Sequence, residues 1–280
     1  MTLPIADALG PARLRLQGGN VADEFGRRFG PKARAKVLDG AVVDANGTVL
    51  DASTTLPPGA VVYHYRELPD EVEVPFDIPV LYRDDTIVVA DKPHFLATMP
   101  RGQHVVQTAV VRLRRALGLP ELSPAHRLDR LTAGVLLFTT RREVRGAYQT
   151  LFARGEVSKT YLAWSSARPE LPGPQLIRSR IVKHLGVLQA SVEPGDPNAT
   201  TLVEPLGGGC YRLTPRTGRT HQLRVHMAAL GVPIDNDPLY PDIVAVEAGD
   251  FTRPLGLIAH RLAFDDPLTG QRRMFVSSRP

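Results

Sequence analysis

The densest cluster of polar and reactive side chains is the run HRLDR at residues 126–130, followed by Thr132-Ala133-Gly134. Its one carboxylate, Asp129, lies among two arginines and a histidine, just before an apolar stretch. Neighbouring cations lower the pKa of a carboxylate, and an ionised, positioned carboxylate can act as a nucleophile or as a base. The run therefore predicts a catalytic acid, and Gly134 would allow a sharp turn or a close approach to its backbone. A structural Asp–Arg pair at the entrance to a strand is the competing interpretation.

A second polar cluster, RTGRTHQLRVH, occupies residues 216–226. Its alternation predicts that Gln222, Arg224 and His226 point to one side of a strand, before the chain becomes helical. An arginine of this cluster could pair with Asp129 in space, and the sequence leaves open which one. An arginine-rich surface strand is the alternative.

A third candidate is Lys159-Thr160-Tyr161, at the start of the segment KTYLAW. In a strand, Lys159 and Tyr161 share a face. A tyrosine beside a catalytic acid can stack on a base or move a proton. An ordinary core tyrosine is the alternative.

Metal chemistry is not expected. His221 and His226 are five residues apart, which fits neither helical nor strand spacing for two ligands on one face. Cys210 is the only cysteine, which excludes an internal disulfide framework and a cysteine-based metal site.

The chain has 280 residues, of which 43% are hydrophobic and 22% charged, so it can bury a large core. It contains no run of 18 apolar residues, and its N-terminus lacks the basic and apolar regions of a secretory signal. Together with the cysteine count, these features predict a cytoplasmic protein with no membrane partner. We expect a monomer, because no apolar stripe stands out as exposed.

A net charge of +5 permits a polyanionic partner without proving one. The arginines, however, are grouped around the polar clusters. A solvated basic surface is one interpretation, and a phosphate-binding face is the one that four such groups favour. The groups are Arg112, Arg114 and Arg115; Arg127 and Arg130; Arg141, Arg142 and Arg145; and Arg216, Arg219 and Arg224.

Sequence patterns divide the chain into three parts. Residues 10–70 predict a small module, residues 71–79 an acidic, proline-rich linker, and residues 80–280 the main domain. In the main domain, apolar residues at intervals of three and four predict helices at 104–117 and 141–154. Strands are expected at KTYLAW and in a C-terminal hairpin. Strands and helices without βαβ alternation indicate an α+β fold with a mixed, largely antiparallel central sheet flanked by helices.

Taken in order, five stretches resemble the RluA/RluD-type family of RNA pseudouridine synthases, and HRLD and TGRTHQLRVH are the most specific parts. The resemblance implies the pseudouridine synthase fold for the main domain, and the N-terminal module is similar to the alpha-L RNA-binding module of many such enzymes. The five stretches are VLYRDDTIVVADKP (80–93), HRLDRLTAGVLLFT (126–139), Phe152 through KTYLAW, TGRTHQLRVHMAALGVPIDNDPLY (217–240) and IAHRLAFDDPLTG (258–270).

The resemblance also implies a role for each matched residue. Asp129 is expected to be the catalytic aspartate, and Arg224 to pair with it and keep it ionised. Tyr161 is expected to stack on the target base and take part in proton transfer, and Arg127 to fill the gap left by the flipped base. The remaining polar residues of the two motifs are expected RNA contacts: His126, Arg130, Arg219, His221 and Gln222.

Two departures from the family pattern stand out. Asn236 replaces a usual glycine, and Ile258-Ala259-His260 replaces the usual order Leu-His-Ala. Both changes are expected to alter loop shape, and so the choice of target.

The implied reaction breaks the bond between uracil N1 and ribose, turns the base, and joins its carbon-5 to the same sugar carbon, in rRNA or tRNA. Nothing is oxidised, so neither cofactor nor metal is needed. The base must first be extruded from its stack. Two alternatives remain open: a non-catalytic RNA-binding protein on the same fold, which would not need Asp129, and a hydrolase that uses Asp129 on a glycosidic bond.

Overall fold

The computed structural model describes residues 9–64, 70–102, 104–167 and 170–279. The chain forms two compact units, Met1–Asp70 and Glu71–Pro280, and each has its own hydrophobic core. Among the described residues, no helix is long and apolar enough to cross a bilayer.

The N-terminal unit packs helices against short strands. Helix α1 (Val21–Phe29) begins at Asn20, whose side chain accepts a hydrogen bond from the amide of Asp23 at 3.0 Å and so caps the helix. The apolar face of α1 contributes Val21 and Phe25 to the core. The other elements are α2 (Pro31–Leu38), β1 (Ala12–Arg15), β2 (Gly19–Asn20), β3 (Val42–Val43), β4 (Thr55–Leu56) and β5 (Val61–His64).

The second unit is built on strands that join, among the described residues, into one 11-stranded sheet. They are β6 (Val80–Arg83), β7 (Ile87–Lys92), β8 (Ser123–Pro124), β9 (Ala133–Thr139), β10 (Ser158–Trp164), β11 (Gln175–Val182), β12 (Ser191–Glu193), β13 (Ala199–Gly207), β14 (Cys210–Pro215), β15 (Leu257–Asp265) and β16 (Arg272–Val276).

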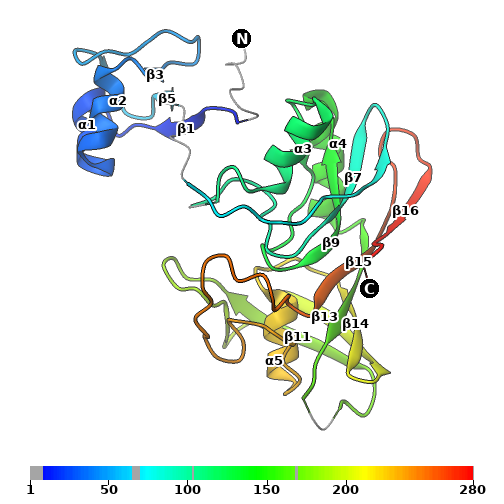
Figure 1. Cartoon of the computed structure of the whole chain (residues 1–280). Coiled ribbons are helices and arrows are strands. Elements are labelled where there is room, and N and C mark those ends of the chain that lie inside the picture. Colours follow the sequence, from blue (N-terminus) through cyan, green and yellow to red (C-terminus); the bar gives the residue numbers. More distant parts are fainter. Residues whose placement is uncertain (1–8, 65–69, 103, 168–169, 280) are drawn as a thin grey trace. The chain divides into compact units, whose positions relative to one another are not determined.

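The strand order is β12-β11-β13-β14-β10-β15-β9-β7-β6, with β16 on β15 and β8 on β9 (Figure 1). The pair β15–β9 is parallel, and the other pairs of this sheet are antiparallel. The predicted α+β class with a largely antiparallel sheet is therefore confirmed. The predicted strand at KTYLAW and the C-terminal hairpin are confirmed as β10 and as β15–β16.

Two of the hydrophobic cores along the sheet are each covered by a helix. Helix α4 (Arg142–Arg154) packs residues such as Tyr148 onto β7, β9 and β15. Helix α5 (Gln222–Ala229) packs residues such as Leu223 onto β10, β13 and β14. Figure 1 shows α3 (Ala109–Leu117) and α4 beside β7 and β9, and α5 beside β11 and β13. Strand β15 contributes side chains to both of these cores. It lies between β10 and β9, so the two cores meet next to the strand that carries Lys159 and Tyr161.

The predicted helix at 141–154 is confirmed as α4, but the helix predicted at 104–117 begins only at Ala109. Its N-cap is Thr108, whose side chain accepts from the amide of Val111. The preceding amides of residues 105–107 donate instead to the carboxylate of Glu71, at 2.6 to 3.0 Å. This acceptor holds them in a loop. Residues 71–79, predicted as a linker, belong to the second unit.

The strand predicted through residues 222–226 is wrong, because these residues open helix α5. Gln222, Arg224 and His226 are all buried, and each finds an internal polar partner. The alternation in the sequence therefore reflects buried polar contacts on several sides of a helix, and not one solvent-facing side of a strand.

Candidate active site

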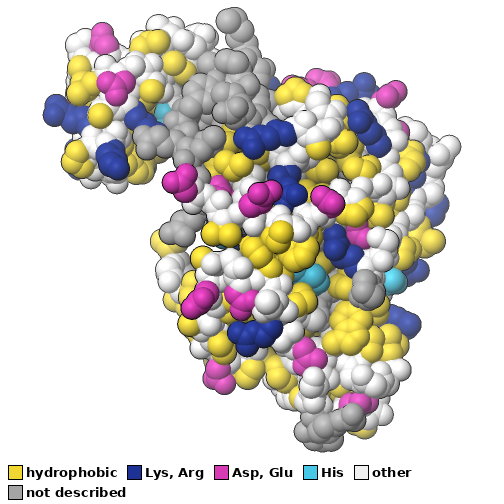
Figure 2. Space-filling model, in the orientation of Figure 1, with side chains coloured by type: hydrophobic (Ala, Val, Ile, Leu, Met, Phe, Trp, Pro, Cys, Tyr) yellow, Lys and Arg dark blue, Asp and Glu magenta, His cyan; other side chains and the backbone are white. Residues whose placement is uncertain are grey.

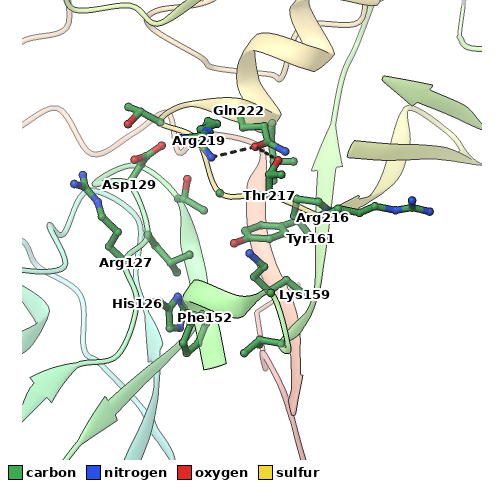
Figure 3. Close-up of a pocket in the computed structure, with 18 of the residues that line it drawn as sticks. His126, Arg127, Asp129, Phe152, Lys159, Tyr161, Arg216, Thr217, Arg219 and Gln222 are labelled. Carbon is green, nitrogen blue, oxygen red and sulfur yellow. Dashed lines mark hydrogen bonds between the residues drawn. The ribbon is translucent and has the colours of Figure 1, made fainter. Parts of the chain in front are cut away.

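A cleft of about 910 Å³ lies where three segments of the second unit meet (Figure 3). The segments are residues 125–132, residues 152–161 and residues 214–224, and together they bring the three polar clusters of the sequence to one place. Every residue predicted for the site lines this cleft except Arg130, which is exposed beside it. Within the described ranges, no three His, Cys, Asp or Glu side chains gather as a metal site would require.

The loop that carries Asp129 is fixed through its backbone on both sides of the acid. The hydroxyl of Thr98 donates to the carbonyl of Leu128 at 2.7 Å and accepts from its amide at 3.1 Å. The ammonium of Lys92 donates to the carbonyl of Arg130 at 3.2 Å. The acid is therefore positioned by its neighbours' main chain, and its own side chain stays available to the cleft.

Lys92 is a functional candidate that the sequence patterns missed. Its side chain is fully buried, and its ammonium also donates to the carbonyls of Pro93 and Leu96, at 2.9 and 2.7 Å. Burial lowers the pKa of Lys92 well below its usual range, while the nearby charge of Asp129 acts in the opposite direction. The available signal was a lysine directly after the apolar run and the acid Asp91 in β7, because a charged side chain is rarely fully buried without a partner.

Gly134 joins the Asp129 loop to the sheet. It has a φ of +111°, and a Cβ at this position would lie 2.3 Å from the carbonyl oxygen of Ala259 on β15. The close backbone approach predicted for this glycine is confirmed, and the partner that approaches it is the parallel strand β15. No side chain larger than hydrogen fits without moving one of the two strands.

Tyr161 faces the cleft from β10, where the pairing with β15 contains a bulge between Thr160 and Leu162. Bulges re-aim side chains and are common beside active sites. Burial raises the pKa of Tyr161, and the charge of Asp129 raises it further. The phenol therefore keeps its proton. Lys159 lines the same cleft, so the predicted shared face of Lys159 and Tyr161 is confirmed.

The ion pair expected between Arg224 and Asp129 is not formed. Arg224 instead makes a bidentate pair with Asp237, at 2.7 Å from Nε to Oδ2 and 2.5 Å from a terminal nitrogen to Oδ1. The two side chains are 3% and 0% exposed. Asp237 satisfies the guanidinium because the loop after α5 folds back over the helix, which local sequence patterns do not reveal. Asp129 is still near enough for its charge to act on Arg224.

Gln222, predicted as an RNA contact, is part of a buried scaffold. Its side-chain amide donates to Thr200 and Thr201 and accepts from Thr217 and from the backbone of Arg219, at 2.7 to 3.0 Å. These four hydrogen bonds leave little capacity for a ligand. Gln222 thus shapes the 216–221 loop from behind.

His221, also predicted as an RNA contact, lies at the turn before α5 and faces Tyr240. Its Nδ1 is 3.0 Å from the hydroxyl of Tyr240, and the two rings meet edge-on with centroids 5.7 Å apart. Burial lowers the pKa of His221, while the charge of Asp129 acts in the opposite direction. The ring is therefore neutral near pH 7, and it links the cleft wall to the loop that carries Asp237.

His126 also has internal partners. Its ring stacks on Phe152 with centroids 4.4 Å apart, and Nε2 accepts from the amide of Leu137 at 3.1 Å. Burial lowers the pKa of His126 to about 3, with Lys159 as a second, smaller cause. The ring is therefore neutral near pH 7, and it supports the cleft wall without offering a positive charge to phosphate.

Exposed cations stand at the rim of the cleft. Arg127, Arg216 and Arg219 line it and are exposed. Figure 2 shows one face of the molecule, on which Lys and Arg side chains are interspersed with Asp and Glu. On that face the basic side chains do not form one continuous patch.

Comparison with known proteins identifies the family. A family model described as RNA pseudouridylate synthase matches residues 86–229, about half of the chain. The chain belongs to this family. It is 33% identical over 200 residues to the dual-specificity RNA pseudouridine synthase RluA of Pasteurella multocida, a match that covers 69% of this chain and 89% of the relative. The predicted RluA-type resemblance is confirmed.

Some relatives are much longer than the region that matches this chain. The chain is 32% identical over 218 residues to the mitochondrial tRNA pseudouridine(32) synthase of Saccharomyces cerevisiae, a match that covers 73% of this chain and 46% of the yeast protein. The chain thus spans under half the length of that relative. The structure of human RNA pseudouridylate synthase domain containing 1 shares the fold, with a TM-score of 0.58 and 24% identity over 73% of this chain and 84% of that chain.

The structure also explains one departure from the family pattern. Asn236, which replaces a usual glycine, has a φ of 59°. Asparagine tolerates this left-handed conformation better than other side chains do. Its amide donates to the carbonyl of Pro254 at 2.9 Å. The backbone conformation that favours glycine is therefore kept, and the substitution adds a tie between two loops beside Asp237.

Proposed function

We propose that this chain isomerises uridine to pseudouridine in rRNA or tRNA, with Asp129 as the catalytic carboxylate. The observation that supports the proposal is the position of Asp129 in the cleft wall. The protonated phenol of Tyr161 and the charges of Lys92 and Arg224 lie within its electrostatic reach. A carboxylate held among these groups is available to attack the anomeric carbon or to remove a neighbouring proton.

The cleft volume lies in the range of ligand pockets and admits a nucleoside extruded from its stack. Arg127 is exposed at the rim, where its side chain can replace the flipped base in the stack. Tyr161 offers a ring on which the extruded base can stack. The reaction is an isomerisation that oxidises nothing and removes no atom except for an exchanged proton, so these residues need no cofactor.

The proposed class of RNA substrate is inferred from the names of the relatives. One is named for a tRNA position and another for dual specificity, which supports tRNA or rRNA as the substrate. The rim arginines Arg216 and Arg219 would bind phosphates, and affinity would fall as salt rises. Selection would come from the shape of a loop or stem-loop. We expect a monomer.

The N-terminal unit is proposed to be an alpha-L-like RNA-binding module. Two of its basic side chains have internal partners: Arg28 pairs with Glu24 at 2.9 Å and Arg34 with Asp23 at 3.2 Å. These pairs reduce the positive charge that the helices offer to RNA. The unit is therefore expected to add less affinity than the rim arginines of the cleft.

The test is isomerisation by the purified chain. RNA carrying tritium at carbon-5 of uridine should release tritium, and the base should stay attached to the sugar as pseudouridine. Free uracil in place of pseudouridine would indicate a hydrolase, and binding without either product would indicate a non-catalytic RNA-binding protein. Mapping pseudouridines in cellular RNA with and without the protein would then identify the target.

A further inference from the structure

Lys159 is a cation in the cleft lining to which the proposed reaction has given no role. It projects from β10 on the same face as Tyr161, and both side chains point into the cleft from the strand that faces Asp129 and Arg127 (Figure 3). A Cβ on Gly218 would lie 4.0 Å from its ammonium nitrogen. The side chain therefore reaches from the strand to the 216–221 loop.

The ammonium of Lys159 differs from that of Lys92, the other lysine near Asp129. Lys92 has three carbonyl partners. Lys159 is half-buried, and in the part of the chain that the structure describes no acid pairs with it and no acceptor is hydrogen-bonded to it. Burial lowers the pKa of Lys159. A partly desolvated cation without a partner indicates that a ligand supplies the acceptor.

The proposed reaction creates such an acceptor. When the N1–C1′ bond breaks, its electron pair stays on the base, and uracil carries a negative charge spread over N1 and the exocyclic oxygens. The base then forms the C5–C1′ bond, carbon-5 loses its proton and N1 gains one. Negative charge therefore develops on the uracil ring, next to Tyr161, while the carboxylate of Asp129 reacts with the sugar.

We propose that Lys159 stabilises the detached uracil anion, holding an exocyclic oxygen of the base while it turns. This inference rests on the proposed isomerisation. Lys159 stays positively charged throughout and gives up no proton. Its half-buried position beside Tyr161 suits a base better than a phosphate, because the exposed arginines Arg216 and Arg219 are already available at the rim for phosphates.

The inference is tested with Lys159→Met, which keeps the length of the side chain and removes its charge. At saturating RNA the single-turnover rate should fall about 10²- to 10³-fold, the loss typical of one donor to a developing anion. RNA affinity should change less than about twofold, because one non-phosphate contact is removed. The matched control is Arg272→Met, which removes an exposed charge on β16 outside the cleft and should change neither quantity.

A second readout separates leaving-group stabilisation from a structural role. Fluorine at carbon-5 withdraws electrons and stabilises the uracil anion by itself. With RNA containing 5-fluorouridine, measured by disappearance of that nucleoside, the Lys159→Met defect should shrink at least about tenfold. Lys159→Arg should recover part of the rate on uridine. Should Lys159→Met fail to fold, Lys159→Gln takes its place in the same assays.

Three results would overturn the inference. One is a Lys159→Met rate within about twofold of wild type. Another is lost RNA affinity with an unchanged rate at saturation, which would make Lys159 a phosphate contact. The third is a defect of equal size on uridine and 5-fluorouridine. Failure of the wild-type chain to form pseudouridine would instead overturn the proposed function, so the two failures are distinguishable.

Discussion

The two walls of the cleft hold their functional side chains in different ways. The wall that carries Asp129 is fixed through main-chain contacts: Thr98 and Lys92 bind carbonyls on either side of the acid, and Gly134 packs against β15. The opposite wall, around α5, is fixed by buried polar side chains, of which the Arg224–Asp237 pair is the centre. Backbone packing positions the acid, and a charged network positions its surroundings.

This difference has a physical consequence. A buried polar network stabilises only while every member has its partner, since an unpaired buried charge is expensive. A wall held by backbone packing is instead destabilised when a substitution adds volume between its strands. The two walls should therefore respond to opposite kinds of substitution.

The largest effect is expected on the charged wall. Asp237→Asn leaves Arg224 buried without its counter-charge, which should lower the free energy of unfolding by about 3–5 kcal/mol, as measured by urea denaturation. Asp265→Asn is the control, because its pair with Arg272 is exposed and should contribute at most about 1 kcal/mol. Equal losses in the two variants would mean that the Arg224–Asp237 pair is not the centre of this wall.

The next effect is expected on the packed wall. Gly134→Ala places a Cβ against the Ala259 carbonyl in a left-handed conformation, and should reduce the free energy of unfolding by about 2–3 kcal/mol. Displacement of the adjacent acid should lower the isomerisation rate about 10²-fold. Gly118→Ala is matched to it, with a φ of +65° and open space, and should leave the rate unchanged. A fully active Gly134→Ala enzyme would contradict packing as the means of positioning.

The effect that is smallest near neutral pH, and that grows as the solution is acidified, is a pH dependence on the packed wall. The pKa of His126 is about 3 when folded, below its ordinary value of 6.5, so below pH 6.5 the unfolded chain binds a proton that the folded chain does not. Stability should therefore fall as pH drops from 6.5 toward 3, by at most about 1.4 kcal/mol per pH unit for this group. The variant His126→Gln should show a shallower slope in denaturation series. An unchanged slope would mean that His126 protonates in the folded protein.

Much of this arrangement is predictable from sequence because it is local. The period of α4, the strand at Lys159 and Tyr161, and the need for glycine at Gly134 follow from residue types and spacing. The partner of Arg224 does not, because Asp237 meets it through a loop that folds back over α5. The strand predicted at the start of α5 was wrong because alternating polar residues there have buried partners inside the protein, which the sequence alone does not reveal.

The central claim is that the carboxylate of Asp129 carries the reaction. Asp129→Asn keeps the shape of the side chain and removes its charge. Tritium release from carbon-5-labelled uridine RNA should fall at least about 10³-fold, while RNA affinity at fixed salt stays within about twofold. An Asn variant that releases tritium at the wild-type rate would contradict the account.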